Sequence, residues 1–255
     1  MKISIVTVCH NAASTIEECL QSVAGQSYHD VEHIVIDGAS TDGTMEIIDK
    51  YRDQLAVVVS EPDRGIYDAM NKGIGEASGD VIGTLNADDW YADTNVLARV
   101  AETFKSDDRL EAVYGDLVYV AKGDPTRIIR YWKSRPYKEG LFEHGWMPAH
   151  PTFFVRSDVY QRFGLFDLEF MIQSDFELTM RFMAVNKIVT RYLPGVMVRM
   201  RMGGVTNNSV RNVIDGNIEA YRACRKNGLD VSPLFIARKM LSRIPQFLNR
   251  SRAPD

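Results

Sequence analysis

Cysteine is scarce in this sequence, and the few cysteines show no pattern. Cys9, Cys19 and Cys224 have neither the paired spacing of a zinc site nor the density of a disulfide framework. Such usage is typical of a reducing compartment. We therefore expect neither a thiolate metal centre nor a fold held together by disulfides.

Long apolar runs are missing as well. No segment approaches the roughly 20 apolar residues that a membrane-spanning helix needs. Residues 1–6 begin directly with a strand pattern, without the charged region, apolar core and cleavage site of a signal peptide. These absences predict a cytoplasmic protein.

The chain also lacks an excess of positive charge. Its net charge of −4 argues against a general nucleic-acid binder. The apolar and charged fractions, 45% and 25%, are ordinary for a globular protein. A length of 255 residues allows one large domain, or one domain with an appendage.

Glycine is absent from the loop where a dinucleotide-binding fold would need it. The loop after the first strand pattern reads His10-Asn11-Ala12-Ala13 instead of Gly-x-Gly-x-x-Gly. A Walker-type lysine loop is missing too. A nucleotide, if one is bound, must be held by a different arrangement.

What the sequence does contain is an alternation of strand and helix patterns. Apolar strand patterns cover residues 3–8, 31–36, 55–60 and 80–85, with helical patterns between them. This alternation predicts an α/β fold with a mostly parallel, twisted sheet flanked by helices. In such a sheet, ligands bind at the carboxyl ends of the strands.

The pattern changes after a turn at residues 91–95 and a helix at 94–105. A hairpin, a long loop and a further strand should follow, within 112–132, 133–151 and 188–193. The stretch 200–208 contains Gly203-Gly204 and is expected to be mobile. Helical patterns close the chain. We predict a catalytic domain over 1–205 and a C-terminal helical extension over 206–255.

Two adjacent carboxylates, Asp88 and Asp89, follow Asn86 where the fourth strand pattern breaks into a loop. Mg²⁺ and Mn²⁺ prefer carboxylate oxygen, and they are commonly held by one or two carboxylates together with substrate phosphates. A strand-end Asp-Asp pair is thus a candidate clamp for a metal and a diphosphate. The alternative is a pair of solvated turn residues, one of which caps the next helix.

Acidic residues also follow two other strand patterns. Asp37 could accept a hydrogen bond from a ribose hydroxyl or a pyrimidine N–H, or it could bond to its own backbone in a turn. Glu61 and Asp63 could contact a base or sugar, and Arg64 a phosphate. Their alternative is a solvated charged loop. Asn71, on the helix that follows, could line the same crevice.

Four further candidates lie in the second half of the chain. Asp175 stands at the start of a helix, where it could be a general base or a helix cap, and the local sequence does not favour the base. His150 could meet a diphosphate oxygen or be a core residue. Arg199 and Arg201 could close over an anionic donor or be surface charges.

Six motifs stand in order along the chain: Ser4-Ile-Val-Thr-Val-Cys-His-Asn11, Ile36-Asp-Gly-Ala-Ser-Thr-Asp-Gly43, Glu61-Pro-Asp-Arg-Gly-Ile-Tyr-Asp-Ala-Met-Asn-Lys-Gly73, Gly79-Asp-Val-Ile-Gly-Thr-Leu-Asn-Ala-Asp-Asp89, His150-Pro-Thr-Phe-Phe-Val-Arg156 and Ser174-Asp175. In this order the chain resembles family 2 glycosyltransferases with the GT-A fold, over nearly its full length. It is most similar to bacterial enzymes that build exopolysaccharide, capsule or O-antigen repeat units.

The resemblance implies a role for each candidate. Asp88 and Asp89 would hold Mn²⁺ or Mg²⁺, although Asn86 stands where the family usually begins its acidic motif. Asp175 would be the catalytic base. The residues that would bind the nucleotide-sugar donor are Thr7, Asn11, Asp37, Glu61, Asp63, Arg64, Asn71, Asn86, Asp88, His150 and Arg201.

The activity that the resemblance implies is inverting sugar transfer. The donor would be a nucleotide-diphosphate sugar, most often a UDP-sugar in this family. The acceptor would be a hydroxyl of a saccharide or of a polyprenyl-diphosphate-linked glycan in surface polysaccharide synthesis. Such an enzyme needs one base and one metal site, unlike the carboxylate pair of a glycosidase.

The end of the chain mixes apolar residues with five cations between Leu234 and Arg252, and no acid intervenes before Asp255. A basic amphipathic segment can lie on an anionic membrane surface. We therefore expect the protein to associate with the cytoplasmic face of the inner membrane. The alternatives are a helix packed on the domain and a contact between two copies of the chain.

Two other functions fit part of the pattern. A sugar nucleotidyltransferase shares the nucleotide, the metal and the sheet, but it usually has a glycine-rich basic loop after the first strand. A non-catalytic nucleotide-sugar-binding subunit would bind the donor without transfer or hydrolysis. Products distinguish the two enzyme classes, because a glycosyltransferase releases a nucleoside diphosphate and a nucleotidyltransferase releases pyrophosphate.

Overall fold

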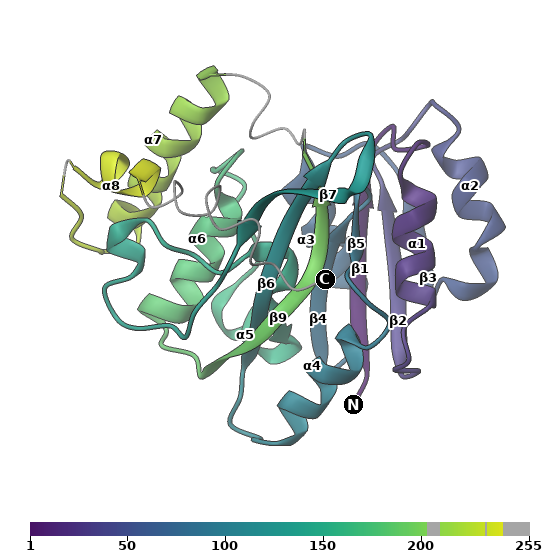
Figure 1. The fold of residues 1–255 in the computed structure, drawn as a ribbon, viewed down its shortest axis with the longest axis horizontal. Coiled ribbons are helices and arrows are strands. Elements are labelled where there is room, and N and C mark those ends of the chain that lie inside the picture. Colours follow the sequence, from purple (N-terminus) through teal and green to yellow (C-terminus); the bar gives the residue numbers. More distant parts are fainter. Residues whose placement is uncertain (203–209, 233, 242–255) are drawn as a thin grey trace.

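A computed structural model describes residues 1–202, 210–232 and 234–241. Within them, a central sheet of nine strands is covered by helices on both faces. Figure 1 shows the first helices of the chain at one side of this sheet and the last helices at the other. The predicted α/β class is confirmed.

The first half of the sheet is parallel, as the alternating pattern predicted. Helices connect these strands, and the inner strands read as apolar runs because they are covered on both sides. The strands are β1 (Ile3–Cys9), β2 (Val31–Asp37), β3 (Val57–Ser60) and β4 (Val81–Asn86). The helices between them are α1 (Ile16–Ala24), α2 (Thr44–Lys50) with the short turn η1 (Arg52–Gln54), and α3 (Ile66–Glu76).

Side chains of β1 alternate between two helical layers, as strand geometry requires. Val6 and Val8 belong to the core on the α3 side, whereas Ile5 and Cys9 pack on the α1 side. At Gly73 of α3, an added Cβ would lie 2.2 Å from Val6 Cγ1. This glycine therefore lets α3 approach the sheet closely, which fixes the position of the loop that precedes α3.

The second half of the sheet is mixed. Within it, β6 pairs parallel with β9, while β4–β8, β5–β9, β6–β7 and β6–β8 are antiparallel. The elements are β5 (Asp89–Tyr91), α4 (Val96–Lys105), β6 (Ala112–Ala121), β7 (Asp124–Trp132), η2 (Phe142–His144), η3 (His150–Thr152), β8 (Phe154–Arg156), α5 (Ser157–Phe163) and β9 (Thr190–Arg201).

Two sequence-based predictions about this half were wrong. The stretch from Asp89 to Tyr91 is a strand rather than part of a turn, because it pairs with the end of β9. The second wrong prediction concerns β9. This strand continues through Pro194-Gly195 to Arg201, whereas the sequence suggested that it ends at residue 193. Irregular pairing with β6 near Asp116 accommodates the interruption. The rest of the predicted mobile loop, 203–208, lies outside the described residues.

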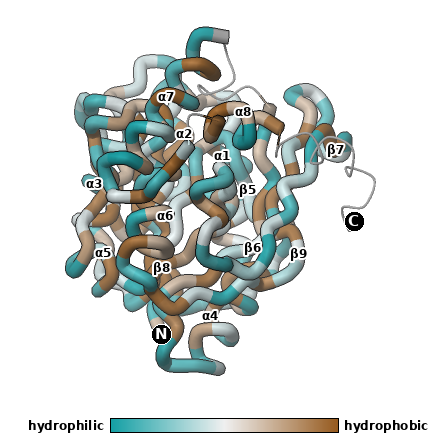
Figure 2. The backbone as a smooth tube through the Cα atoms, turned by 90° about the vertical axis from the view of Figure 1, so that its left-hand side faces the viewer, coloured by the Kyte–Doolittle hydropathy of each residue, from teal (hydrophilic) through white to brown (hydrophobic). Residues whose placement is uncertain are grey.

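The last helices pack beside α6 (Ser174–Met180), which continues into a π-helical turn (Arg181–Val185). They are α7 (Val210–Lys226) and α8 (Phe235–Leu241), and hydrophobic and hydrophilic stretches alternate along them (Figure 2). Their buried residues, including Cys224 and Phe235, join the same core as Phe176 of α6. Among the described residues, no helix has the length and apolar character needed to cross a membrane.

Candidate active site

The register of the parallel strands brings several predicted site residues to one edge of the sheet. Cys9 pairs with Asp37, and Val8 pairs with Asn86, so the ends of β1, β2 and β4 lie level. Asp37 also pairs with Ser60 at the end of β3. This edge is the carboxyl end of the strands, where a ligand crevice forms in open α/β sheets.

Asp37 is fully buried and held from several directions. Its carboxylate accepts hydrogen bonds from the Ser40 backbone (3.0 Å), the Ser40 hydroxyl and the Ser60 hydroxyl (2.7 Å), with the Cys9 thiol at 3.5 Å. Burial raises the pKa of Asp37, but these hydrogen bonds outweigh burial and hold the pKa below its ordinary value. The charge is therefore retained at a fixed place on the edge.

The loop before α3 lies against the end of β2. An added Cβ on Gly38 would lie 2.4 Å from Asp63 Oδ2, so the two loops touch there. The side chain of Arg64 is exposed and donates to Asp68 Oδ1 at 3.0 Å. Glu61 is also exposed and pairs with Lys72 at 2.7 Å. Glu61 and Arg64 are thus accessible to a ligand, while each is already engaged by a neighbour on α3.

Asn11 connects the loop after β1 to the loop after β2. Its Oδ1 accepts the Thr41 backbone N–H at 2.9 Å, and its own N–H donates to the Ser40 hydroxyl at 2.7 Å. Asn11 adopts a positive φ of 50°, a conformation that asparagine tolerates better than most residues. The structure therefore brings Asn11 to the same edge as Asp37, where it shapes the loop.

The carboxylates Asp88 and Asp89 lie at the junction of β4 and β5. Asp89 is 1% exposed, and its Oδ2 accepts a hydrogen bond from Asn86 Nδ2 at 3.1 Å. Burial and then the charge of Asp88 raise the pKa of Asp89 well above its ordinary value. Burial also raises the pKa of Asp88, and nearby Arg201 opposes this rise. Two neighbouring carboxyls are thus held where ionisation is costly without a cation.

Two oxygens of this cluster are left without a hydrogen-bond donor in the described part of the chain. Asp89 Oδ1 and Asn86 Oδ1 are buried, and neither has a hydrogen-bond partner among the described residues. Such oxygens are the ligand type that Mg²⁺ and Mn²⁺ prefer. No group of three or more His, Cys, Asp or Glu side chains in the described part of the chain could hold a metal unaided. The residues therefore fit a metal whose remaining ligands come from a substrate diphosphate.

Arg201 is anchored on β9 and does not lie in a mobile loop as predicted. Its guanidinium lies 4.5 Å from the centre of the Trp90 ring, donates to the Asp88 carbonyl at 3.1 Å and forms an ion pair with Glu18. The cation is thus placed beside the Asp88–Asp89 pair by pairing of β9 with β5. Arg199 lies opposite Trp90 in the same ladder.

Asp175 is partly buried at the second position of α6. Its Oδ1 accepts the Phe176 backbone N–H at 2.8 Å and lies 3.2 Å from the hydroxyl of Tyr67 on α3. Burial and then the charge of Asp175 raise the pKa of Tyr67, so this hydroxyl stays protonated and can donate. No hydrogen-bond partner of Asp175 Oδ2 is found among the described residues. This oxygen is therefore not engaged by a donor in that part of the protein.

His150 lies between the sheet and α6. The side chain is buried, its Nε2 is 3.3 Å from Thr84 Oγ1 on β4, and its ring packs edge-on against Phe166. Burial lowers the pKa of His150, while the nearby charge of Asp175 acts in the opposite direction. The imidazole is therefore close enough to Asp175 to sense its charge, and it is mainly neutral at pH 7.

Two predicted donor-binding residues are engaged elsewhere. Thr7 is fully buried on the α1 side of β1, with its hydroxyl 2.9 Å from His33 Nε2. Asn71 uses both ends of its amide on the backbone of Phe166, at 2.9 Å each. In this conformation neither side chain is presented at the strand-end edge. Their contact with a donor stays a prediction.

Residues that the sequence did not single out complete the site. Ser40 and Ser60 hold Asp37, and Tyr67 holds Asp175. Ser40 and Tyr67 lie inside the ordered motifs, and Ser60 ends a strand pattern, so their positions carried a signal. Glu219 on α7 contacts the turn before α6, and nothing in its local sequence indicates this contact.

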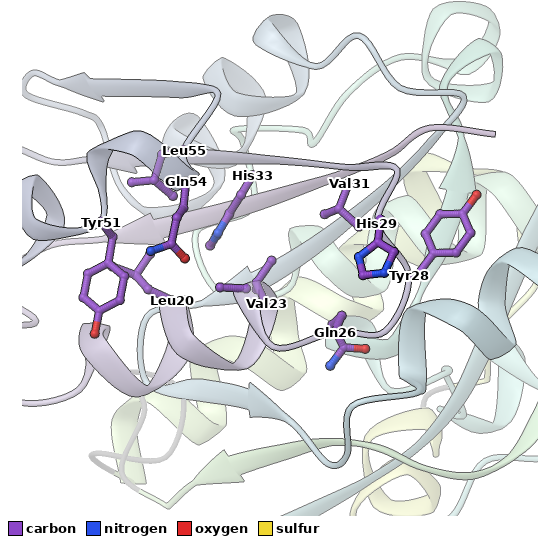
Figure 3. Close-up of a pocket in the computed structure, with 11 residues that line it drawn as sticks. Leu20, Val23, Gln26, Tyr28, His29, Val31, His33, Tyr51, Gln54 and Leu55 are labelled. Atoms are coloured by element: carbon purple, nitrogen blue, oxygen red, sulfur yellow. The ribbon is translucent and has the colours of Figure 1, made fainter.

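A cavity of about 210 Å³ lies away from this edge, between α1 and the start of β2. Figure 3 shows Val23, Tyr28, His33 and Tyr51 among its lining residues. None of the predicted site residues lines it. A second cavity of about 190 Å³ lies beside the start of α3 and includes Tyr67 in its wall. Arg64 is the predicted site residue that lines this second cavity, and Asp175 does not line it.

The sequence comparison identifies this α/β protein, which has an acidic pair at the end of β4, as a nucleotide-sugar-dependent glycosyltransferase. Residues 4–163 match the family described as Glycosyl transferase family 2. The chain belongs to this family, and the GT-A fold that the sequence suggested is confirmed.

Curated relatives cover most of the chain. A PGL/p-HBAD biosynthesis glycosyltransferase of Mycobacterium bovis is 29% identical over 211 residues, which are 81% of this chain and 80% of that protein. An uncharacterized glycosyltransferase of Mycobacterium tuberculosis is 30% identical over 190 residues, covering 74% of this chain and 71% of its own length. These alignments extend the family match into the region of α6.

Solved structures show the same fold. A Staphylococcus aureus TarS structure in complex with UDP has a TM-score of 0.66 and 20% identity, covering 98% of this chain and 71% of that one. The chain spans 43% of the longer TarS structure. The mannosyltransferase PcManGT from Pyrobaculum calidifontis, in complex with GDP-Man and Mn²⁺, has a TM-score of 0.66 and 19% identity. The match covers 95% of this chain and 69% of that one.

Proposed function

We propose that this protein transfers a sugar, with inversion, from a UDP-sugar to a hydroxyl of a saccharide or a polyprenyl-diphosphate-linked glycan. The observation that carries the proposal is that the acidic pair and Asp175 lie on different elements. Asp88 and Asp89 lie together at the strand edge, while Asp175 offers a free oxygen on another element. Inverting transfer needs one such base, set apart from the groups that hold the leaving diphosphate.

The nucleoside of the donor would lie over the ends of β1, β2 and β3. Asp37 supplies a fixed charge there, and Glu61 and Arg64 are exposed on the loop that touches the end of β2. A carboxylate at this place suits a ribose hydroxyl or the ring N–H of uracil. The UDP complex of TarS supports uridine as the first nucleotide to test, and the GDP-Man complex of PcManGT makes guanosine the second.

The diphosphate would lie over the junction of β4 and β5. Asp88 and Asp89 would hold Mn²⁺ or Mg²⁺ there, with Arg201 as a nearby fixed cation. When bound, the metal neutralises charge that develops on the departing nucleoside diphosphate. The PcManGT complex with Mn²⁺ supports this assignment.

Proton transfer would fall to Asp175. Its Oδ1 is held by Tyr67 and the Phe176 backbone, so Oδ2 is left to take the proton of the acceptor hydroxyl. The acceptor oxygen then bonds to the anomeric carbon from the face opposite the diphosphate. The bond from that carbon to the diphosphate oxygen breaks, and one displacement inverts the configuration.

Product analysis tests this proposal. UDP-glucose, UDP-galactose, UDP-GlcNAc and GDP-mannose would each be supplied with Mn²⁺, together with p-nitrophenyl glycosides and a polyprenyl-diphosphate-linked monosaccharide as acceptors. We expect release of a nucleoside diphosphate and, by NMR, a glycoside of inverted anomeric configuration. In a parallel reaction with UTP and a sugar 1-phosphate in place of the UDP-sugar, release of pyrophosphate would instead indicate the nucleotidyltransferase alternative. Binding without any product would leave only the non-catalytic alternative.

Membrane association through the C-terminal residues remains a proposal. On α8 the apolar side chains of Met240 and Leu241 are exposed beside the exposed Arg238, whereas Lys239 is buried. Residues 242–255, with the other three cations, lie outside the described residues. We expect the protein to pellet with phosphatidylglycerol vesicles, and the variant Arg238→Glu/Leu241→Asp to pellet much less. Equal pelleting of both proteins would refute a role for this surface.

A further inference from the structure

The turn that leads into α6 is held by a carboxylate from a distant part of the chain. Glu219 on α7 accepts three consecutive backbone N–H bonds, from Met171 at 3.1 Å, Ile172 at 2.8 Å and Gln173 at 3.0 Å. Hydrogen bonds to an ionised acceptor are stronger than those between neutral groups. Asp175 follows this turn by two residues, so the turn sets where α6 begins.

Tyr67 holds the same turn from the side of α3. Its hydroxyl lies 3.0 Å from the Ile172 carbonyl oxygen and 3.2 Å from Asp175 Oδ1, so one proton is shared between two acceptors. The Ile172 backbone is therefore fixed at both its N–H, by Glu219, and its carbonyl, by Tyr67. Movement of the turn would change the Tyr67–Asp175 contact directly.

Helix α7 approaches this turn more closely than most side chains would allow. An added Cβ on Gly216, one turn before Glu219, would lie 3.1 Å from Ile172 Cγ2 and 3.4 Å from Gln173 Nε2. At the other end of α7, Lys226 pairs with Asp167 at 2.5 Å. The helix is thus seated along the whole segment that precedes α6, and Glu219 is its contact at the turn.

We propose that Glu219 is a positioning residue for the base Asp175, acting through the backbone of the turn before α6. The proposal rests on the function proposed for Asp175. Glu219 does not contact the strand-end edge, and its carboxylate is occupied by backbone donors. Geometry of this kind matters because a displacement of about 1 Å at a reacting group can cost about 100-fold in rate.

The body of α6 is held independently of Glu219. Glu177 is buried and pairs with Arg181 through two contacts, at 2.9 Å and 3.0 Å. Phe176 lies in the central core, packed edge-on against Phe142. Removing the Glu219 carboxylate should therefore loosen the turn without unfolding the helix.

Amide hydrogen exchange tests the structural half of the proposal without reference to activity. In Glu219→Ala, the amides of residues 171–173 should exchange at least about tenfold faster than in wild type, because they lose their acceptor. Glu219→Gln keeps one acceptor oxygen, so its exchange rates should lie between those of wild type and Glu219→Ala. Asp215→Ala is the matched control, since Asp215 lies on the same helix and forms an ion pair with the exposed Arg211 at 3.6 Å.

Kinetics test the positioning half, with the UDP-sugar that turns over in the product assay. For Glu219→Ala we expect kcat to fall about 10- to 100-fold, with KM for that UDP-sugar and UDP binding with Mn²⁺ within about twofold of wild type. Glu219→Gln should restore part of kcat. When Asp175 is already replaced by Asn, adding Glu219→Ala should lower kcat by less than about a further twofold, because Glu219 acts through Asp175.

Each outcome decides a different point. Unchanged exchange at 171–173 in Glu219→Ala would overturn the contact, and faster exchange with wild-type kcat would overturn the positioning role. A parallel loss of UDP binding and kcat would show a merely structural role. If wild type shows no turnover, the base and the proposed function fail together, while the exchange data still report whether Glu219 holds the turn.

Discussion

Asp175→Asn is expected to lower kcat for sugar transfer by about 100- to 10,000-fold, the usual contribution of a general base. The asparagine keeps an oxygen for the Phe176 amide and Tyr67, so the fold of the turn should survive. What it loses is the ability of the second oxygen to take a proton. Binding of UDP with Mn²⁺ should stay within about twofold of wild type, because Asp175 lies apart from the strand-end carboxylates.

The chain offers a close control for this substitution. Asp158 is also the second residue of a seven-residue helix that opens with Ser-Asp, but it lies on α5 and pairs with Arg162 at the surface. Asp158→Asn should leave kcat unchanged. Comparable loss in both variants would mean that the effect comes from the start of a helix rather than from catalysis. Wild-type kcat in Asp175→Asn would rule out Asp175 as the base.

Asp89→Asn is expected to remove the Mn²⁺-dependent part of UDP binding and to lower sugar transfer about 100- to 1,000-fold. The same substitution should not lower the melting temperature of the metal-free protein. Asp89 is almost fully buried, and its Oδ1 has no partner within the described residues, so its charge is costly to the fold. Titration calorimetry with and without Mn²⁺, together with melting curves, measures both effects.

The pH dependence of this site follows from the raised pKa of Asp89. In the metal-free protein the folded state holds the Asp89 proton more tightly than the unfolded chain, whose pKa is near 3.8. The free energy of unfolding should therefore fall as pH rises above that value, and Asp89→Asn should remove this contribution. Mn²⁺ binds the ionised form, so Mn²⁺-dependent UDP binding should strengthen with rising pH.

Asp93→Asn is the matched control for Asp89→Asn. Asp93 lies four residues further on, is partly exposed and pairs with Arg99 at 3.0 Å. Its substitution should leave Mn²⁺-dependent UDP binding and its pH dependence at wild-type values. If Asp89→Asn binds UDP as well as wild type at equal Mn²⁺, the metal site is elsewhere. A lower melting temperature for metal-free Asp89→Asn would mean that the carboxylate stabilises the fold.

The parallel half of the fold could be predicted from the sequence because its strands are apolar runs that alternate with helical patterns. The strand-end positions of Asp37, Asn86 and Asp88 followed from the same patterns, since strand length fixes where each loop begins. The second half was less predictable. Pro194-Gly195 resembles a stop, and it is pairing with β6 and β5 that carries β9 past it to Arg201.

The parts of the site that the sequence did not predict depend on side-chain direction and on contacts between distant segments. A run of apolar residues on both faces of β1 does not show that Thr7 points toward α1 and meets His33. The capture of Asn71 by the Phe166 backbone joins segments 95 positions apart in sequence. Glu219 meets the turn at Ile172 only because α7 packs on α6, which no local pattern records.

The C-terminal helix α8 also shows that a sequence pattern does not determine side-chain direction. A basic amphipathic pattern describes a surface helix, yet it does not say which cations face water. Lys239 is buried, donates to Gln173 at 2.6 Å and lies over the Phe176 ring. The cation that the sequence assigned to a membrane surface therefore packs beside α6 instead.

Thermal melting with UDP, GDP and dTDP, each with and without Mn²⁺, tests the central claim most directly. A ligand at about 100 times its dissociation constant stabilises the folded state by about 2.7 kcal/mol, or roughly 5–10 °C for a chain of this size. The account predicts such a rise for UDP only when Mn²⁺ is present, and none in Asp89→Asn. Well-folded wild-type protein that no nucleotide stabilises, with or without Mn²⁺, would contradict it.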